Sequence, residues 1–253
     1  MKQYKKNFEL KNTAKDKLEG KYGGAMLILL LSTAISWMTR LIINTVAGST
    51  MNSVYTMTNS TSAATAVSFL FDGLLLLAGI LLGVMNAGIT LYYLNIACGQ
   101  PFLVRDIFYG YKTDSKRILI VSAAMAIFQA VCLWPGQYLL QQYLSNKSLT
   151  WLLYALIATV AGLCVYVPVS LGIAMSYYLL LDFPQNSGKE TLQLCWRIMK
   201  GQRGRLFCLE LSFLPLMLLC ILSFGIGFLW LEPYMQLTYT YFFLDLMNPK
   251  EIS

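Results

Sequence analysis

Histidine is absent from this chain of 253 residues, and charged residues are scarce. Without histidine, the chain lacks the usual general base near neutral pH and the commonest metal ligand. It also lacks the HExxH, GxSxG and DxD patterns of hydrolases and the GxxxxGK(S/T) loop of nucleotide-binding proteins. We therefore expect no catalytic, cofactor-binding or metal-binding residues, no cofactor and no enzymatic activity.

Charged residues make up 12% of the chain, against about 25% in an ordinary soluble domain. The net charge of +7 does not indicate nucleic-acid binding, because the basic residues lie in short segments between apolar runs. The six cysteines form no CxxC pair, so we interpret them as free thiols. The low content of charged residues therefore excludes an ordinary soluble domain.

Long hydrophobic runs are what the chain has instead. Hydrophobic residues make up 57% of it, and the mean hydropathy is +0.58. About 20 helical residues cross a bilayer, and backbone groups in lipid must be hydrogen-bonded within the segment. The sequence therefore predicts an all-α, polytopic transmembrane helical bundle that forms a single integral membrane domain over residues 1–253. The predicted spans are 23–48, 66–98, 116–144, 149–182, 205–224 and 226–247.

Lysine and arginine gather on alternate segments. Residues 1–22, the second and fourth connections and the C-terminal tail hold all of them except Lys147 and Arg40. The first connection, from Ser49 to Ala66, has none. The positive-inside rule then places both termini in the cytoplasm.

Two cytoplasmic stretches have the pattern of amphipathic helices. In residues 1–22, Leu10, Ala14 and Leu18 recur every four positions among lysines. In residues 186–201, Ser187 and Glu190 fit a capping box at the start of a helix. Such a basic helix either lies in the headgroup plane or packs on the inner end of the bundle. The candidate contacts to anionic lipid are Lys189, Arg197, Lys200, Arg203 and Arg205.

A short pattern recurs three times and suggests three helical hairpins of one plan. The aromatic pairs Tyr92-Tyr93, Tyr177-Tyr178 and Phe242-Phe243 close the second, fourth and sixth spans. Each pair follows a helix-weakening residue, and these residues are Gly83, Pro168 and Pro233. Interrupted helices form binding sites in many transporters, whereas Pro and Gly are also simply commoner in membrane helices.

Ionisable side chains at membrane depth are candidate functional residues. Arg40 and Asp72 fall near the outer ends of the first two spans, where they could pair with each other and with Glu232. Glu210 lies inside the fifth span, where a pair with Arg203 or Arg205 is favoured. Asp182 and Asp245 are interpreted as interfacial caps.

Motifs in the last third of the chain resemble a known family. They are Ser176-Tyr177-Tyr178, Asp182-Phe183-Pro184, Met199-Lys200-Gly201, Arg205-Leu206-Phe207, Leu211-Ser212-Phe213, Gly225-Ile226-Gly227-Phe228-Leu229-Trp230 and Pro233-Tyr234-Met235. Together they resemble the bacterial membrane family catalogued as domain of unknown function nine-seven-five, which is similar to the membrane domain of some glycerophosphodiester phosphodiesterases. The pair Glu232-Pro233 departs from it, since the family more often has an apolar residue there. The resemblance implies a multi-pass protein of the bacterial plasma membrane and brings no catalytic residue.

Two functions stay open. The leading hypothesis is a non-enzymatic membrane protein that binds anionic lipids on the cytoplasmic side or a partner membrane protein. The alternative is a small-solute or lipid transporter that uses helices interrupted at Gly83, Pro168 and Pro233.

Overall fold

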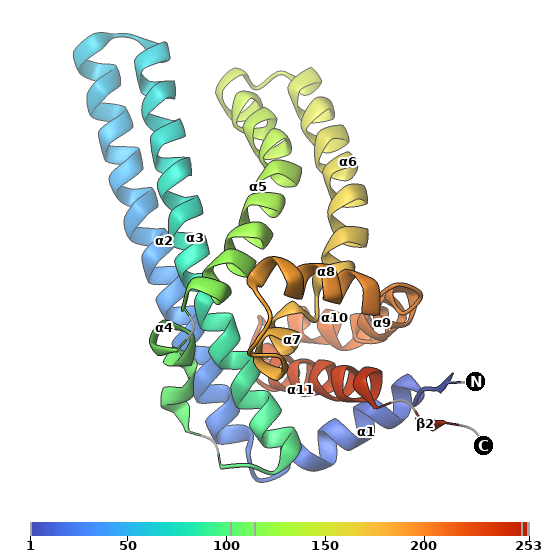
Figure 1. The fold of residues 1–253 in the computed structure, drawn as a ribbon. Helices are drawn as coiled ribbons and strands as arrows, with labels where there is room; N and C mark the ends of the chain where they lie inside the picture. Colours follow the sequence, from blue (N-terminus) through green and yellow to red (C-terminus); the bar gives the residue numbers. More distant parts are fainter. Residues whose placement is uncertain (1, 102, 114, 249, 252–253) are drawn as a thin grey trace.

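Two long helical hairpins stand on a base of shorter helices in the computed structural model, which describes residues 2–101, 103–113, 115–248 and 250–251. The first hairpin joins α2 (Tyr22–Thr58) to α3 (Thr61–Cys98), and the second joins α5 (Ser115–Asn146) to α6 (Leu149–Ile173). Figure 1 shows the tips of the two hairpins standing apart at one end of the molecule.

The base is assembled from both ends of the chain. Its elements are β1 (Lys2–Gln3), α1 (Asn7–Leu18), η1 (Val104–Phe108), α4 (Tyr109–Lys112), α7 (Ser176–Asp182), α8 (Gly188–Ile198), α9 (Arg203–Leu211), α10 (Leu214–Leu222), α11 (Phe228–Met247) and β2 (Lys250–Glu251). Strands β1 and β2 pair antiparallel, with Lys2 opposite Glu251. The two ends of the chain therefore lie side by side (Figure 1).

Five stretches are long and apolar enough to cross a membrane: 22–58, 66–98, 115–144, 149–182 and 203–222. They match the first five predicted spans, and the all-helical, multi-pass prediction agrees with them. The sixth predicted span, 226–247, is occupied by α11, which is not among these five. The count of six spans therefore stays a prediction.

Helix α11 is the centre of the base. It contacts α1, α2, α3 and α10, and Figure 1 shows it lying crosswise to the long hairpins. Ten of its twenty residues are buried, including the polar Thr238, Thr240 and Asp245. The other residues of α11 are partly exposed except for Trp230, which is exposed, so the packing around the helix covers most of its surface and accommodates its polar side chains.

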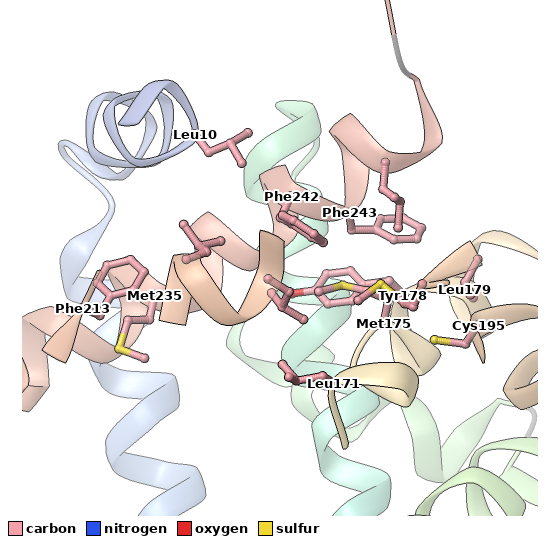
Figure 2. Close-up of a cluster of buried hydrophobic side chains, with 14 of the residues drawn as sticks. Leu10, Leu171, Met175, Tyr178, Leu179, Cys195, Phe213, Met235, Phe242 and Phe243 are labelled. Atoms are coloured by element: carbon pink, nitrogen blue, oxygen red, sulfur yellow. The ribbon is translucent and has the colours of Figure 1, made fainter. Parts of the chain in front are cut away.

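The three aromatic pairs converge in this core. Tyr92, Tyr93, Phe242 and Phe243 are almost fully buried, and the Tyr178 ring stacks on Phe243 with 5.1 Å between the ring centroids. The Tyr178 hydroxyl also lies 3.1 Å from the Thr240 hydroxyl. Figure 2 shows Tyr178, Phe242 and Phe243 among the buried side chains. These five aromatic side chains therefore pack the core of the base.

The distal parts of the long hairpins have the opposite character. On α2, the buried residues Ala25, Ile28 and Ser32 all lie near the base. Beyond them, apolar side chains such as Leu41, Ile42 and Leu70 are more than half exposed. An exposed apolar surface that continues along both helices of a hairpin indicates contact with lipid.

The first connection is much shorter than the sequence predicted. Residues 49–66 were expected to form a loop, but α2 continues to Thr58 and α3 begins at Thr61. Only Asn59, in the left-handed conformation with φ 48°, and Ser60, the N-cap of α3, separate the helices. The stretch after Gly48 contains no Pro or Gly, so nothing in it breaks a helix.

The helices run without interruption through Gly83, Pro168 and Pro233, which contradicts the predicted breaks there. A Cβ on Gly83 would lie 3.0 Å from the Ser122 Cβ, so this glycine serves the close packing of α3 on α5. The actual breaks follow Ile173, between α6 and α7, and Leu211, between α9 and α10.

Both predicted amphipathic segments contain a helix whose apolar face packs on the protein. Leu10, Ala14 and Leu18 of α1 are at most 1% exposed. Helix α8 begins at the predicted capping box: Ser187 N donates to Glu190 Oε2 at 2.8 Å, and Glu190 N donates to Ser187 Oγ at 3.3 Å. These two hydrogen bonds hold the pKa of the Glu190 carboxyl below its usual value. The location of α1 and α8 at a membrane surface stays a prediction.

Candidate functional site

A groove with a basic rim lies between α5, α6 and α8. Its volume is about 770 Å³, which falls within the range of pockets that bury small ligands. We call it the basic groove. Its lining residues are Ala124, Val169, Ile173, Leu192, Gln193, Trp196, Arg197, Lys200, Gly201 and Arg203.

The helical period of α8 separates the two sides of this groove. Leu192 and Trp196 are four residues apart and share one face of the helix, as do Gln193 and Arg197. Leu192 joins the apolar side chains from α5 and α6, while Arg197 and Lys200 are exposed. One helix thus contributes both an apolar floor and a cationic rim.

Trp196 is held between a glycine and an arginine. A Cβ on Gly172 would lie 2.7 Å from two ring carbons of Trp196, so only glycine lets the indole lie this close to α6. On the indole, the Arg203 guanidinium carbon lies 3.7 Å from the ring centroid, within the range of a cation–π interaction. The contact between Trp196 and Gly172 joins two helices, so no local sequence pattern could have indicated it.

The charges of the groove are of one sign. Arg197, Lys200 and Arg203 line it, and none of the other lining residues in the described part of the chain is acidic. The Nε of Arg203 is buried without a hydrogen-bond partner among the residues that the structure describes. An unpaired buried donor of this kind is costly, so an acceptor from a ligand would stabilise it. The groove can therefore bind an anion that also carries apolar groups.

Cys195, on the inward face of α8, is fully buried. Burial raises the pKa of its thiol, and hydrogen bonds from Ser176 and Met175 only partly oppose this effect. The thiol therefore stays protonated and acts as a packing group rather than as a nucleophile. No group of three or more Cys, Asp or Glu side chains in the described part of the chain could hold a metal ion.

Two of the five candidate lipid contacts lie outside the basic groove. Lys189 is exposed but does not line it. Arg205 forms an ion pair with Asp245, and the two side chains are only 18% and 6% exposed. Asp245 was interpreted as an interfacial cap, so its burial and its charged partner correct that interpretation.

The Arg205–Asp245 pair also holds the N-terminal segment. Lys5 N donates to the two carboxylate oxygens of Asp245 at 3.1 and 3.2 Å, and Arg205 Nη2 donates to Lys5 O at 2.9 Å. The Arg205 guanidinium lies 4.9 Å from the ring centroid of Tyr4 and 4.8 Å from that of Phe242. We call these five residues the terminal clamp.

The intramembrane candidates are not brought together. Asp72 accepts a hydrogen bond from Trp134 Nε1 at 3.4 Å, while Arg40 is exposed and, among the described residues, pairs with neither Asp72 nor Glu232. Glu232 instead accepts from Gln236 Nε2 at 3.1 Å, one helical turn away. The favoured pair of Glu210 with a neighbouring arginine is also not formed in the described structure, because Arg205 faces Asp245.

These observations define the class of the protein. An all-helical chain with five long apolar helices is a multi-pass membrane protein. The chain belongs to the family described as Protein of unknown function (DUF975), which matches residues 1–250. This confirms the family resemblance identified from the sequence motifs. No curated protein and no solved structure matches the chain.

Proposed function

We propose that this chain is a non-enzymatic protein of the bacterial plasma membrane that binds an anionic phospholipid in the basic groove. The observation that carries the proposal is the combination of three cations, no acidic residue and an apolar floor in one groove. A phospholipid has the matching chemistry, with a negative phosphate next to acyl chains.

The position of the groove suits a lipid headgroup. It lies where the apolar helix α6 meets the basic helix α8, at the level where a span gives way to a polar connection. Basic pockets between membrane helices on the cytoplasmic side bind anionic headgroups, and each Lys or Arg near such a surface contributes about 1 kcal/mol. Trp196, which is 42% exposed, is of the residue type favoured at the interface.

The pairing of β1 with β2 supports an even number of crossings. Two segments that hydrogen-bond to each other lie on the same side of the membrane, so the chain must return to the side on which it began. Helices α2, α3, α5 and α6–α7 account for four crossings. In our proposal α9–α10 and α11 form a third hairpin whose helix α11 lies crosswise to the other two hairpins, so it must tilt to complete the sixth crossing. The basic segments place both ends in the cytoplasm.

Binding of a partner membrane protein to the lipid-facing surface is the competing hypothesis, and native mass spectrometry distinguishes it from lipid binding. The transporter hypothesis required helices interrupted at Gly83, Pro168 and Pro233. Because these helices are continuous, the structure offers no support for it at these positions.

Native mass spectrometry of the protein released from its membrane tests the proposal. We expect retention of phosphatidylglycerol or cardiolipin over phosphatidylethanolamine. The double substitution Arg197→Gln/Lys200→Gln should lower the affinity about 30-fold, since two charges contribute about 2 kcal/mol. Gly172→Ala should weaken binding without changing charge, because its methyl group displaces Trp196.

Lys189→Gln is the matched control for the single substitution Arg197→Gln, because each removes one charge from α8 and only Arg197 lines the groove. Equal lipid retention by these two single variants would show that the position of the charge does not matter, and would refute the site. Release with a second polypeptide and no lipid would favour the partner instead.

A further inference from the structure

A second cavity, separate from the basic groove, lies beneath the third hairpin. Its volume is about 570 Å³, and α1, the start of α2, α10 and α11 enclose it. Its lining includes Lys15, Tyr22, Leu216, Leu219, Trp230 and Tyr234. We call it the hairpin cavity.

The lining of the hairpin cavity is polar on one side and apolar on the other. The polar groups come from the elbow between α1 and α2, which supplies Lys15 and Tyr22, and from Tyr234 of the facing helix α11. The apolar groups come from α10 and the following turn. Ser223 also lines this side, but its hydroxyl already donates to Cys220 O and accepts from Gly227 N.

The polar groups of the elbow are free to bind a ligand. Within the described part of the chain, the Lys15 ammonium forms no ion pair and the Tyr22 and Tyr234 hydroxyls form no hydrogen bond. The Tyr22 phenol is near enough to interact electrostatically with the Tyr234 phenol and with Glu19, the residue that follows α1. One ammonium and two hydroxyl donors match the two oxygens of a single carboxylate, which accepts up to four hydrogen bonds.

In the topology proposed above, the apolar side leads to a surface that lies in lipid. Leu219, Phe224 and Ile226 are 63%, 98% and 60% exposed at the tip of the hairpin. Leu219 belongs to α10, and Phe224 and Ile226 follow this helix after one polar residue, Ser223, whose hydroxyl is already hydrogen-bonded. An acyl chain longer than the cavity would therefore continue into the bilayer past this tip.

We infer that the hairpin cavity binds a long-chain fatty acid, with its carboxylate at Lys15, Tyr22 and Tyr234 and its acyl chain along α10. A single cation suits one carboxylate, whereas the three cations of the basic groove suit a phosphate.

Photo-crosslinking with a diazirine analogue of palmitic acid tests this inference on the full-length protein in detergent micelles. We expect labelled peptides from residues 214–234 and competition by palmitate. Methyl palmitate has the same chain without the negative charge, so it should compete at least tenfold more weakly, as expected for the loss of a charge-assisted hydrogen bond.

Two pairs of variants locate the site. Lys15→Gln should weaken palmitate binding about tenfold, whereas Lys17→Gln, on the same helix and outside the cavity, should not. Leu219→Trp should fill the cavity and reduce labelling, whereas Leu218→Trp, an exposed neighbour that does not line it, should leave labelling unchanged.

Three results would overturn the inference. Equal labelling of all four variants would mean that the probe reports general contact with lipid. Equal competition by methyl palmitate would remove the carboxylate from recognition. Retention of phospholipid alone, with no labelling of residues 214–234, would assign the cavity to another occupant.

Discussion

The terminal clamp makes a quantitative prediction for Asp245→Ala. This change removes the carboxylate that pairs with Arg205 and accepts from Lys5 N. Because the Arg205 side chain is only 18% exposed, its charge would be left largely buried without its partner. Breaking one partner out of a buried pair costs about 3–5 kcal/mol. We therefore expect Asp245→Ala to lower the free energy of unfolding by at least about 3 kcal/mol.

The buried cysteines supply the assay. In a variant whose more accessible Cys98, Cys132, Cys164 and Cys208 are replaced by serine, the remaining Cys195 and Cys220 are buried and react with a thiol-reactive dye only when the base unfolds. Dye fluorescence during heating then reports the midpoint of unfolding. A loss of about 3 kcal/mol corresponds to a fall of roughly 6–12 °C for a chain of this size. The matched control is Asp182→Ala, because this carboxylate also ends a helix but is exposed.

A double substitution separates the charge effect from the loss of packing. Replacing a buried ion pair by apolar residues of similar size is often neutral, so Arg205→Met/Asp245→Leu should be more stable than Asp245→Ala. Limited proteolysis near Lys5 should still increase in the double variant, because the hydrogen bonds to the backbone of this residue are lost. If Asp245→Ala unfolded within about 1 °C of the Asp182→Ala control, the proposed contribution of the clamp to stability would be refuted.

Two further predictions concern the packing of the base. Gly88→Ala should lower the free energy of unfolding by about 1–3 kcal/mol, because a Cβ there would collide with the carbonyl of Ile107, whereas Gly79→Ala, with open space around it, should be neutral or stabilising in the same thermal assay. At pH 7, Cys195 should react with iodoacetamide far more slowly than the exposed Cys98, because burial raises the pKa of the Cys195 thiol and only the thiolate reacts. The rate at Cys195 should increase as the pH rises. Equal rates for the two cysteines at pH 7 would contradict this prediction.

The apolar runs determined most of what could be predicted about the fold. A run of some 20 uncharged residues has only one stable backbone arrangement in lipid, so the first five spans follow directly from composition. The capping box at Ser187 was predictable for a similar reason, since it needs only two residues three positions apart. Both signals are local.

The arrangement of α11 could not be predicted in the same way. Its length suits a span, and 226–247 was interpreted as one. Its place in the core depends on contacts with α1, α2 and α3, the last of which ends at Cys98, whereas α11 begins at Phe228. The basic groove has the same origin, because Gly172 and Trp196 form it only when α6 and α8 meet.

The basic residues of α9 show which further signal the sequence did contain. Successive residues of an α-helix are rotated by about 100°, so Arg203 and Arg205 point roughly 160° apart and cannot serve one site. The buried Leu206 and Leu209 lie between these two directions. One arginine is therefore turned toward Trp196 of α8 and the other toward Asp245 of α11. On α11, Asp245 follows the buried Phe242 by three positions and so shares its inward face. Helical register, added to the count of charges, would have separated the cation of the basic groove from the cation of the terminal clamp.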